Sequence, residues 1–123
     1  MSALLDEMNA LGAAAKVASS TLALASGDQK NRAILAAASS IRSEAATIQQ
    51  ANENDMDAAE AAGLSKAKLD RLLLTPERIE AMAVGLESVA ELAEPVGKVL
   101  AEWTRPNGLK IRRVSTPLGV IGV

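Results

Sequence analysis

The sequence predicts an α/β protein in which helices fill most of the chain and strands follow near its end. Apolar residues recur at spacings of three and four up to about residue 93, as on one face of a helix. Two stretches of period-two alternation flank the turn 105–108, which indicates a β-hairpin. Leu118–Val123 is apolar or glycine at every position, as in a strand buried on both faces of a parallel sheet.

Residues 3–25 are predicted to form the first helix. Ser2 is suited to cap its start, and Gly27 is a natural stop. One apolar stripe joins Leu4, Met8, Leu11, Ala15, Ala18 and Leu22. A second helix is expected to start at Asp28 as N-cap and to run to about Gln50 or beyond. Its stripe alternates isoleucine with alanine, which suits close helix packing: Ile34, Ala38, Ile41, Ala45 and Ile48.

The polar stretch Asn52–Asp57 permits a break in the helix. Asp55 could then cap a short helix that ends at Gly63, and Ser65 could cap another. The clearest start signal is the run 75–77, Thr-Pro-Glu, which combines an N-cap, a proline at the first position and an acid in the first turn. The buried face of that helix is predicted to hold Ile79, Met82, Ala83, Leu86, Val89, Ala90 and Ala93.

The end of the chain holds the predicted strands. Val99 to Thr104 and Leu109 to Ser115 flank the turn Arg-Pro-Asn-Gly, and Lys110 and Arg112 would give the hairpin one charged face. The apolar strand from Leu118 onward requires neighbours on each side to satisfy its backbone. We therefore expect the sequence to break off at the entrance of an α/β domain.

Composition excludes several classes of function. The net charge is -2 with a single aromatic residue, so the basic face and stacking platforms of a nucleic-acid-binding protein are not expected. Cysteine and histidine are absent, which excludes a disulfide, a thiolate metal site and imidazole catalysis by these residues. The N-terminal residues do not have the pattern of a targeting peptide. The apolar runs are shorter than the roughly 20 residues that a membrane-spanning helix needs. We expect a cytoplasmic protein without a membrane partner.

Two charged clusters are interpreted as structural. A calcium loop that began at Glu53 would need glycine and glutamate where Ala58 and Leu64 stand, so the acidic run is interpreted as a solvated helix surface. The cations near the turn could hold an anion, but a charged hairpin that resists edge aggregation is the favoured interpretation: Arg105, Lys110, Arg112 and Arg113. Trp103 is interpreted as a packing or interface residue, and Gly119 and Gly122 lack the spacing of a phosphate loop.

Three stretches resemble the gamma-glutamyl phosphate reductase family of the aldehyde dehydrogenase superfamily. They read ANENDMDAA, LDRLLLTPERIEAMAVGLESVA and EPVGKVLAEWTRPNGLKIRRVSTPLGVIGV, and together they cover nearly all of residues 51–123. The resemblance implies an aldehyde dehydrogenase-like fold. Residues 1–98 would be the helical part of the cofactor-binding domain, 99–116 an oligomerisation hairpin, and 117–123 the start of a Rossmann-like sheet.

The resemblance also implies a reaction. The family reduces L-glutamyl 5-phosphate with NADPH to L-glutamate 5-semialdehyde and phosphate, in proline biosynthesis. A cysteine thiolate of the family forms a thioester that accepts hydride, and covalent catalysis of this kind divides one difficult step into two. This chain contains no cysteine, and the resemblance implies that the NADPH-binding residues of the family lie mostly beyond Val123. No catalytic, cofactor-binding or metal-binding residue is therefore assigned to it, and the chain alone is expected to be inactive.

Two alternatives remain open from the sequence. One is a free-standing helical interaction module that ends in a hairpin, although a module is not expected to end in a buried type of strand. The other is a different acylating aldehyde dehydrogenase. In the favoured interpretation the partners are the small-molecule substrate and further copies of the chain, which would form a homo-oligomer through the hairpin.

Overall fold

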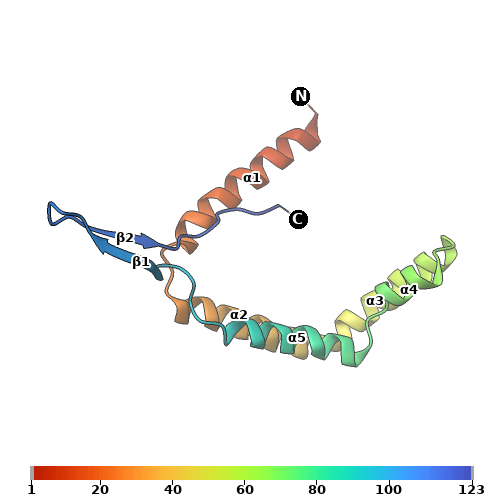
Figure 1. Ribbon diagram of the computed structural model, residues 1–123. Coiled ribbons are helices and arrows are strands. Elements are labelled where there is room, and N and C mark those ends of the chain that lie inside the picture. The colour runs from red at the N-terminus through yellow and green to blue at the C-terminus, as the bar shows by residue number, and fades with distance from the viewer. Residues whose placement is uncertain (1, 123) are drawn as a thin grey trace. The chain divides into compact units, whose positions relative to one another are not determined.

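The computed structural model describes residues 2–122, which contain five helices and one two-stranded sheet (Figure 1). The elements are α1 (Ala3–Leu22), α2 (Gly27–Ser43), α3 (Ala45–Ala61), α4 (Lys66–Leu72), α5 (Pro76–Ala90), β1 (Val99–Thr104) and β2 (Lys110–Val114). These residues divide into two compact units. Asp28–Leu92 forms one, here called the helical unit, and the residues before and after it form the other.

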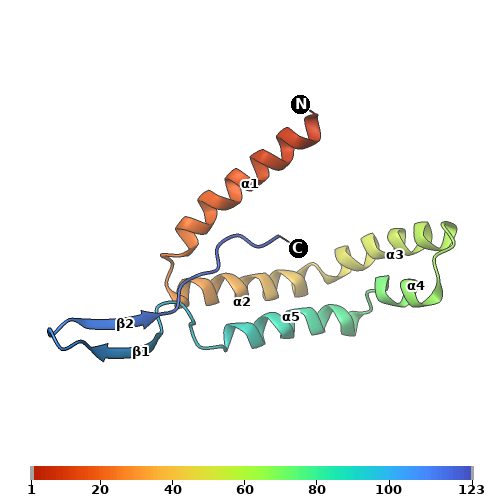
Figure 2. The ribbon, with the colours of Figure 1, turned by 45° about the horizontal axis from the view of Figure 1, so that its top comes forward.

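The helical unit is a long helical hairpin. Figure 2 shows α2 and α3 running outward in succession and α4 and α5 returning beside them. Its buried apolar residues are few and mostly small: Ala38, Ala59, Ile79 and Ala83. Ala38 is the buried residue of α2, and alanine at a contact would let two helix backbones approach closely, so the close packing of α2 stays a prediction.

The predicted break at Asn52–Asp57 is wrong, since the whole stretch lies inside α3. The interruption instead falls at Glu44, where φ is -98° and ψ is 11°. Even there the backbone ladder continues, because the Glu44 amide donates to the Ser40 carbonyl at 3.0 Å. Asp55 therefore caps no helix. The weak helix preference of the polar residues is overcome by the packing of α3 against α4 and α5.

Gly63 ends α3 as the sequence predicts, although the helix that it ends is longer than expected. Its φ is 69°, and its amide donates to the Glu60 carbonyl while the Leu64 amide donates to the Ala59 carbonyl. This pair of bonds is a Schellman motif, which requires a left-handed residue at the position of the glycine. Ser65 precedes α4 at the N-cap position, as predicted, but its side chain makes no capping bond.

The start of α5 is confirmed. The Thr75 hydroxyl accepts a hydrogen bond from the Arg78 amide at 3.2 Å, and Pro76 is the first helical residue. The predicted buried face is confirmed only in part. Ile79 and Ala83 are buried, whereas Met82 and Val89 remain exposed.

The hairpin is confirmed, with β1 and β2 antiparallel and Trp103 opposite Ile111. The Arg105 amide donates to the Leu109 carbonyl at 2.8 Å, and Gly108 adopts φ of 84° in the turn. The register shifts between Val99 and Ala101, which marks a β-bulge at the open end of the hairpin.

Ser2 caps α1 as predicted, since its hydroxyl accepts from the Leu5 amide at 3.4 Å. The helix ends at Leu22, earlier than expected, and Gly27 opens α2 instead of ending α1. Asp28 accordingly lies in the first turn of α2 and is not its N-cap. No residue of α1 is buried.

Residues 117–122 belong to no strand, and Val123 lies outside the described residues. A strand that is covered on both faces requires neighbours that residues 2–122 do not supply. That strand and the predicted division at residues 98 and 116 stay predictions.

Candidate functional site

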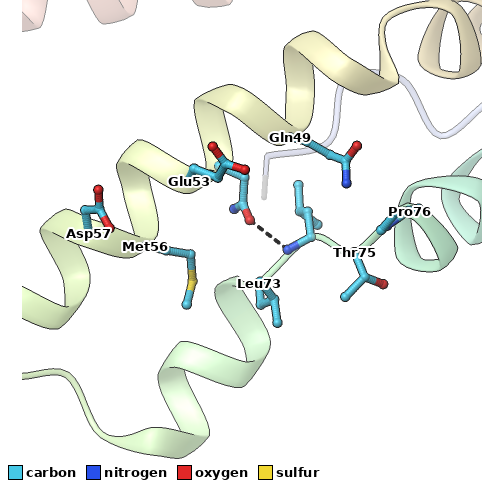
Figure 3. Close-up of a pocket in the computed structure, with 9 residues that line it drawn as sticks. Gln49, Glu53, Met56, Asp57, Leu73, Thr75 and Pro76 are labelled. Atoms are coloured by element: carbon cyan, nitrogen blue, oxygen red, sulfur yellow. Dashed lines mark hydrogen bonds between the residues drawn. The ribbon is translucent and has the colours of Figure 1, made fainter.

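A cleft of about 360 Å³ opens in the helical unit between α3 and the linker from α4 to α5 (Figure 3). One wall comes from a single face of α3, because its residues are spaced three or four apart along the helix. The other wall is the linker with the first residue of α5. The lining residues are Gln49, Asn52, Glu53, Met56, Asp57, Leu73, Leu74, Thr75 and Pro76.

The chemistry of the cleft is acidic and apolar. Glu53 and Asp57 bring carboxylates from α3, and Met56 and the two leucines bring apolar surface. The Glu53 carboxylate accepts a hydrogen bond from the Gln50 side chain at 3.0 Å. Negative charge of this kind opposes the binding of a phosphate or a dinucleotide. The cleft therefore offers a surface for neutral or cationic groups.

Asn52 is the buried polar residue of the helical unit, with 6% of its surface exposed. Its amide nitrogen donates to the Leu72 carbonyl at 2.9 Å, and its amide oxygen accepts from the Leu74 amide at 2.8 Å. The second bond is drawn in Figure 3. One side chain thus satisfies a donor and an acceptor of the linker backbone, in the way that a neighbouring peptide group does in a sheet.

Arg78, which lies on α5, also holds the segment that joins α4 to α5. Its guanidinium donates to the Leu73 carbonyl at 2.8 Å and to the Asp70 carbonyl, and it pairs with the Asp70 carboxylate at 2.9 Å. These carbonyls lie at the end of α4, where backbone acceptors lack helical partners. The linker from α4 to α5 is therefore held by side chains from α3 and α5.

Arg42 joins α2 to α5. Its guanidinium lies 2.7 Å from Glu80 and also donates to Glu87, two turns further along α5. Hydrogen bonds from Arg42 lower the pKa of both carboxyls, and the two carboxylates in turn raise the pKa of Arg42. All three side chains are more than one third exposed, so this network orients the helices and contributes modestly to stability.

The cations that could have held an anion do not share one face of the hairpin. Lys110 and Arg112 stand opposite Thr104 and Glu102, whereas Arg113 stands opposite Ala101 and so points to the other face. Arg112 lies 3.9 Å from Glu102, which offsets part of its charge. The hairpin thus matches the predicted charged surface and does not gather its cations into one anion site.

The acidic run also forms no metal centre: residues 2–122 contain no group of His, Cys, Asp or Glu that could hold a metal ion. Within the same part of the chain, no helix is long and apolar enough to cross a membrane. Asn52 was expected only as the start of a helix break, and no role was predicted for Arg78, although both hold the linker beside the cleft. Both side chains bond to backbone groups, which are the same in every residue. No sequence pattern therefore identifies these contacts.

Known proteins match the chain closely along its length, although no family model matches it. A protein named gamma-glutamyl phosphate reductase from Paramagnetospirillum magneticum is 55% identical over 116 residues, which are 94% of this chain and 27% of that protein. The protein of the same name from Allorhizobium ampelinum is 58% identical over 113 residues, 92% of this chain and 26% of its own length. The chain thus spans about a quarter of the length of the relatives that it matches.

Solved structures match in the same way. The crystal structure of gamma-glutamyl phosphate reductase from Thermotoga maritima superposes with a TM-score of 0.81 at 35% identity, over 84% of this chain and 25% of that one. The Saccharomyces cerevisiae enzyme gives a TM-score of 0.79 at 31% identity, over 84% of this chain and 26% of that one. The order of helices and hairpin described above is therefore an arrangement that occurs within much longer proteins.

Proposed function

This chain is a relative of the gamma-glutamyl phosphate reductases, and on that premise we propose that it forms the N-terminal part of such an enzyme. The reaction is the NADPH-dependent reduction of L-glutamyl 5-phosphate to L-glutamate 5-semialdehyde with release of phosphate, in the cytoplasmic synthesis of proline. The observation that carries the proposal is the identity of 54–58% over more than nine tenths of the chain.

The role of these residues in the reaction is structural. The chain has no cysteine to form a thioester and no histidine to move a proton. The cleft carries Glu53 and Asp57, whose charge opposes the pyrophosphate of a dinucleotide. The residues of the cleft therefore do not fit NADPH.

An exchange of segments tests the proposal. We expect that this chain, put in place of the matching residues of the Paramagnetospirillum magneticum enzyme, preserves turnover, because the two segments are 55% identical. Turnover is measured in the reverse direction, as NADP reduction with glutamate semialdehyde and phosphate. The chain by itself should give no turnover. A folded but inactive chimera, or turnover by the chain alone, would contradict the proposal.

A further inference from the structure

The helix α4 packs on α3 without burying a residue of its own. It has seven residues and none of them is buried, although Leu69 and Leu72 are half-buried. A helix of about two turns is not stable alone in water, because its few hydrogen bonds do not offset the conformational entropy lost in forming the first turn. The position of α4 therefore depends on contacts that it makes outside itself.

Asn52 supplies the buried part of those contacts. Its two hydrogen bonds, at 2.9 and 2.8 Å, join the middle of α3 to the Leu72 carbonyl and the Leu74 amide. If the side chain were removed, both backbone groups would lose their partner at a part-buried place. Each such loss costs more free energy than an exposed ion pair contributes.

We propose that residues 64–74 form a flap over α3 and that the Asn52 side chain sets its closed position. Gly63, with φ of 69°, provides the hinge on one side, and the linker before Pro76 provides the other. Because Leu73 and Leu74 line the cleft, opening of the flap widens it.

Opening of the flap leaves the rest of the helical unit in place. The Arg42 network joins α2 to α5, and each of these helices has buried residues of its own, Ala38 on α2 and Ile79 and Ala83 on α5. Arg78 also holds the end of α4, but from an exposed position where salt and water weaken the contact. The flap is accordingly a local unit of opening, separate from global unfolding.

Amide hydrogen exchange on the 123-residue chain tests the flap, with each amide followed by NMR. In Asn52→Ala we expect the Leu74 amide and the amides of α4 to exchange roughly ten- to a hundredfold faster, the effect of losing one or two buried hydrogen bonds. The amides in the middle of α5 should keep their rates. Asn52→Asp retains an acceptor for the Leu74 amide, so that amide should be protected better than in Asn52→Ala.

Asn54→Ala is the matched control, because Asn54 is the same residue type on the same helix but exposed. It should leave all rates unchanged. Unaltered exchange at Leu74 in Asn52→Ala would overturn the proposal. So would equal acceleration throughout residues 28–92, or a loss of helix content in circular dichroism, because either would make Asn52 a support of the whole unit and not of the flap.

Discussion

The backbone conformation at Gly63 disfavours a residue with a side chain, whereas the conformation at Gly85 favours one. Open space surrounds the Cβ position at both residues, so steric contact does not distinguish them. Gly63 has φ of 69°, whereas Gly85 lies inside α5 with an ordinary helical backbone. We predict that Gly63→Ala lowers the free energy of unfolding by about 1 kcal/mol and that Gly85→Ala raises it by roughly 0.5–1 kcal/mol. Chemical denaturation followed by circular dichroism measures both, and changes of the same sign would refute the argument.

Thr75 gives a second test at the level of single residues. Its hydroxyl accepts from the Arg78 amide, which otherwise has no partner in the first turn of α5. Thr75→Ala should cost about 1 kcal/mol of stability. Ser65 holds the same position before α4 but makes no capping bond, so Ser65→Ala should cost less. Equal denaturation midpoints for the parent chain and Thr75→Ala would show that the cap does not contribute.

At the scale of elements, local signals in the sequence located the starts of α1, α4 and α5, the end of α3 and both strands. Proline, glycine and capping residues act through neighbouring backbone, so Thr75, Gly63 and the hairpin turn could be predicted. The continuity of α3 could not, because it depends on packing against segments that come later in the chain. The cleft was missed for the same reason: Asn52 bonds to backbone groups 20 and 22 residues away.

The pairing of α2 with α5 should weaken in acid. Arg42 lowers the pKa of Glu80 and Glu87 below the ordinary value of 4.5. A lowered carboxyl pKa stabilises the fold above the unfolded value, and that contribution disappears as the pH falls through the folded value. We therefore expect the stability difference between the parent chain and Arg42→Leu to shrink between about pH 5 and pH 3. Denaturation midpoints across that range measure it.

Arg32→Leu is the control for this experiment, since Arg32 is an exposed arginine on the same helix. Its stability difference from the parent should change little over that range. A difference for Arg42→Leu that stayed constant with pH would show that the two carboxylates do not depend on the arginine.

At the scale of the whole molecule, the hairpin is proposed to join one copy of the protein to another. Trp103 is 45% exposed beside Ile111, and two strands alone are marginal in water. Because Gly108 has φ of 84°, a valine there distorts the turn. In the chimeric enzyme, Gly108→Val should weaken the oligomer in light scattering before it changes NADPH affinity. An unchanged oligomer with lost NADPH binding would show that the hairpin serves the ligand.

Trp103 also has a spectroscopic consequence. The chain has no tyrosine or phenylalanine, so its ultraviolet fluorescence comes from this one indole on β1. Circular dichroism at 222 nm is dominated instead by helices, most of which lie in the helical unit. The two signals therefore monitor different parts of one chain without any introduced label. If the hairpin and the helices melt as one cooperative body, both curves will coincide, and if they melt separately, the emission of Trp103 will shift at its own temperature.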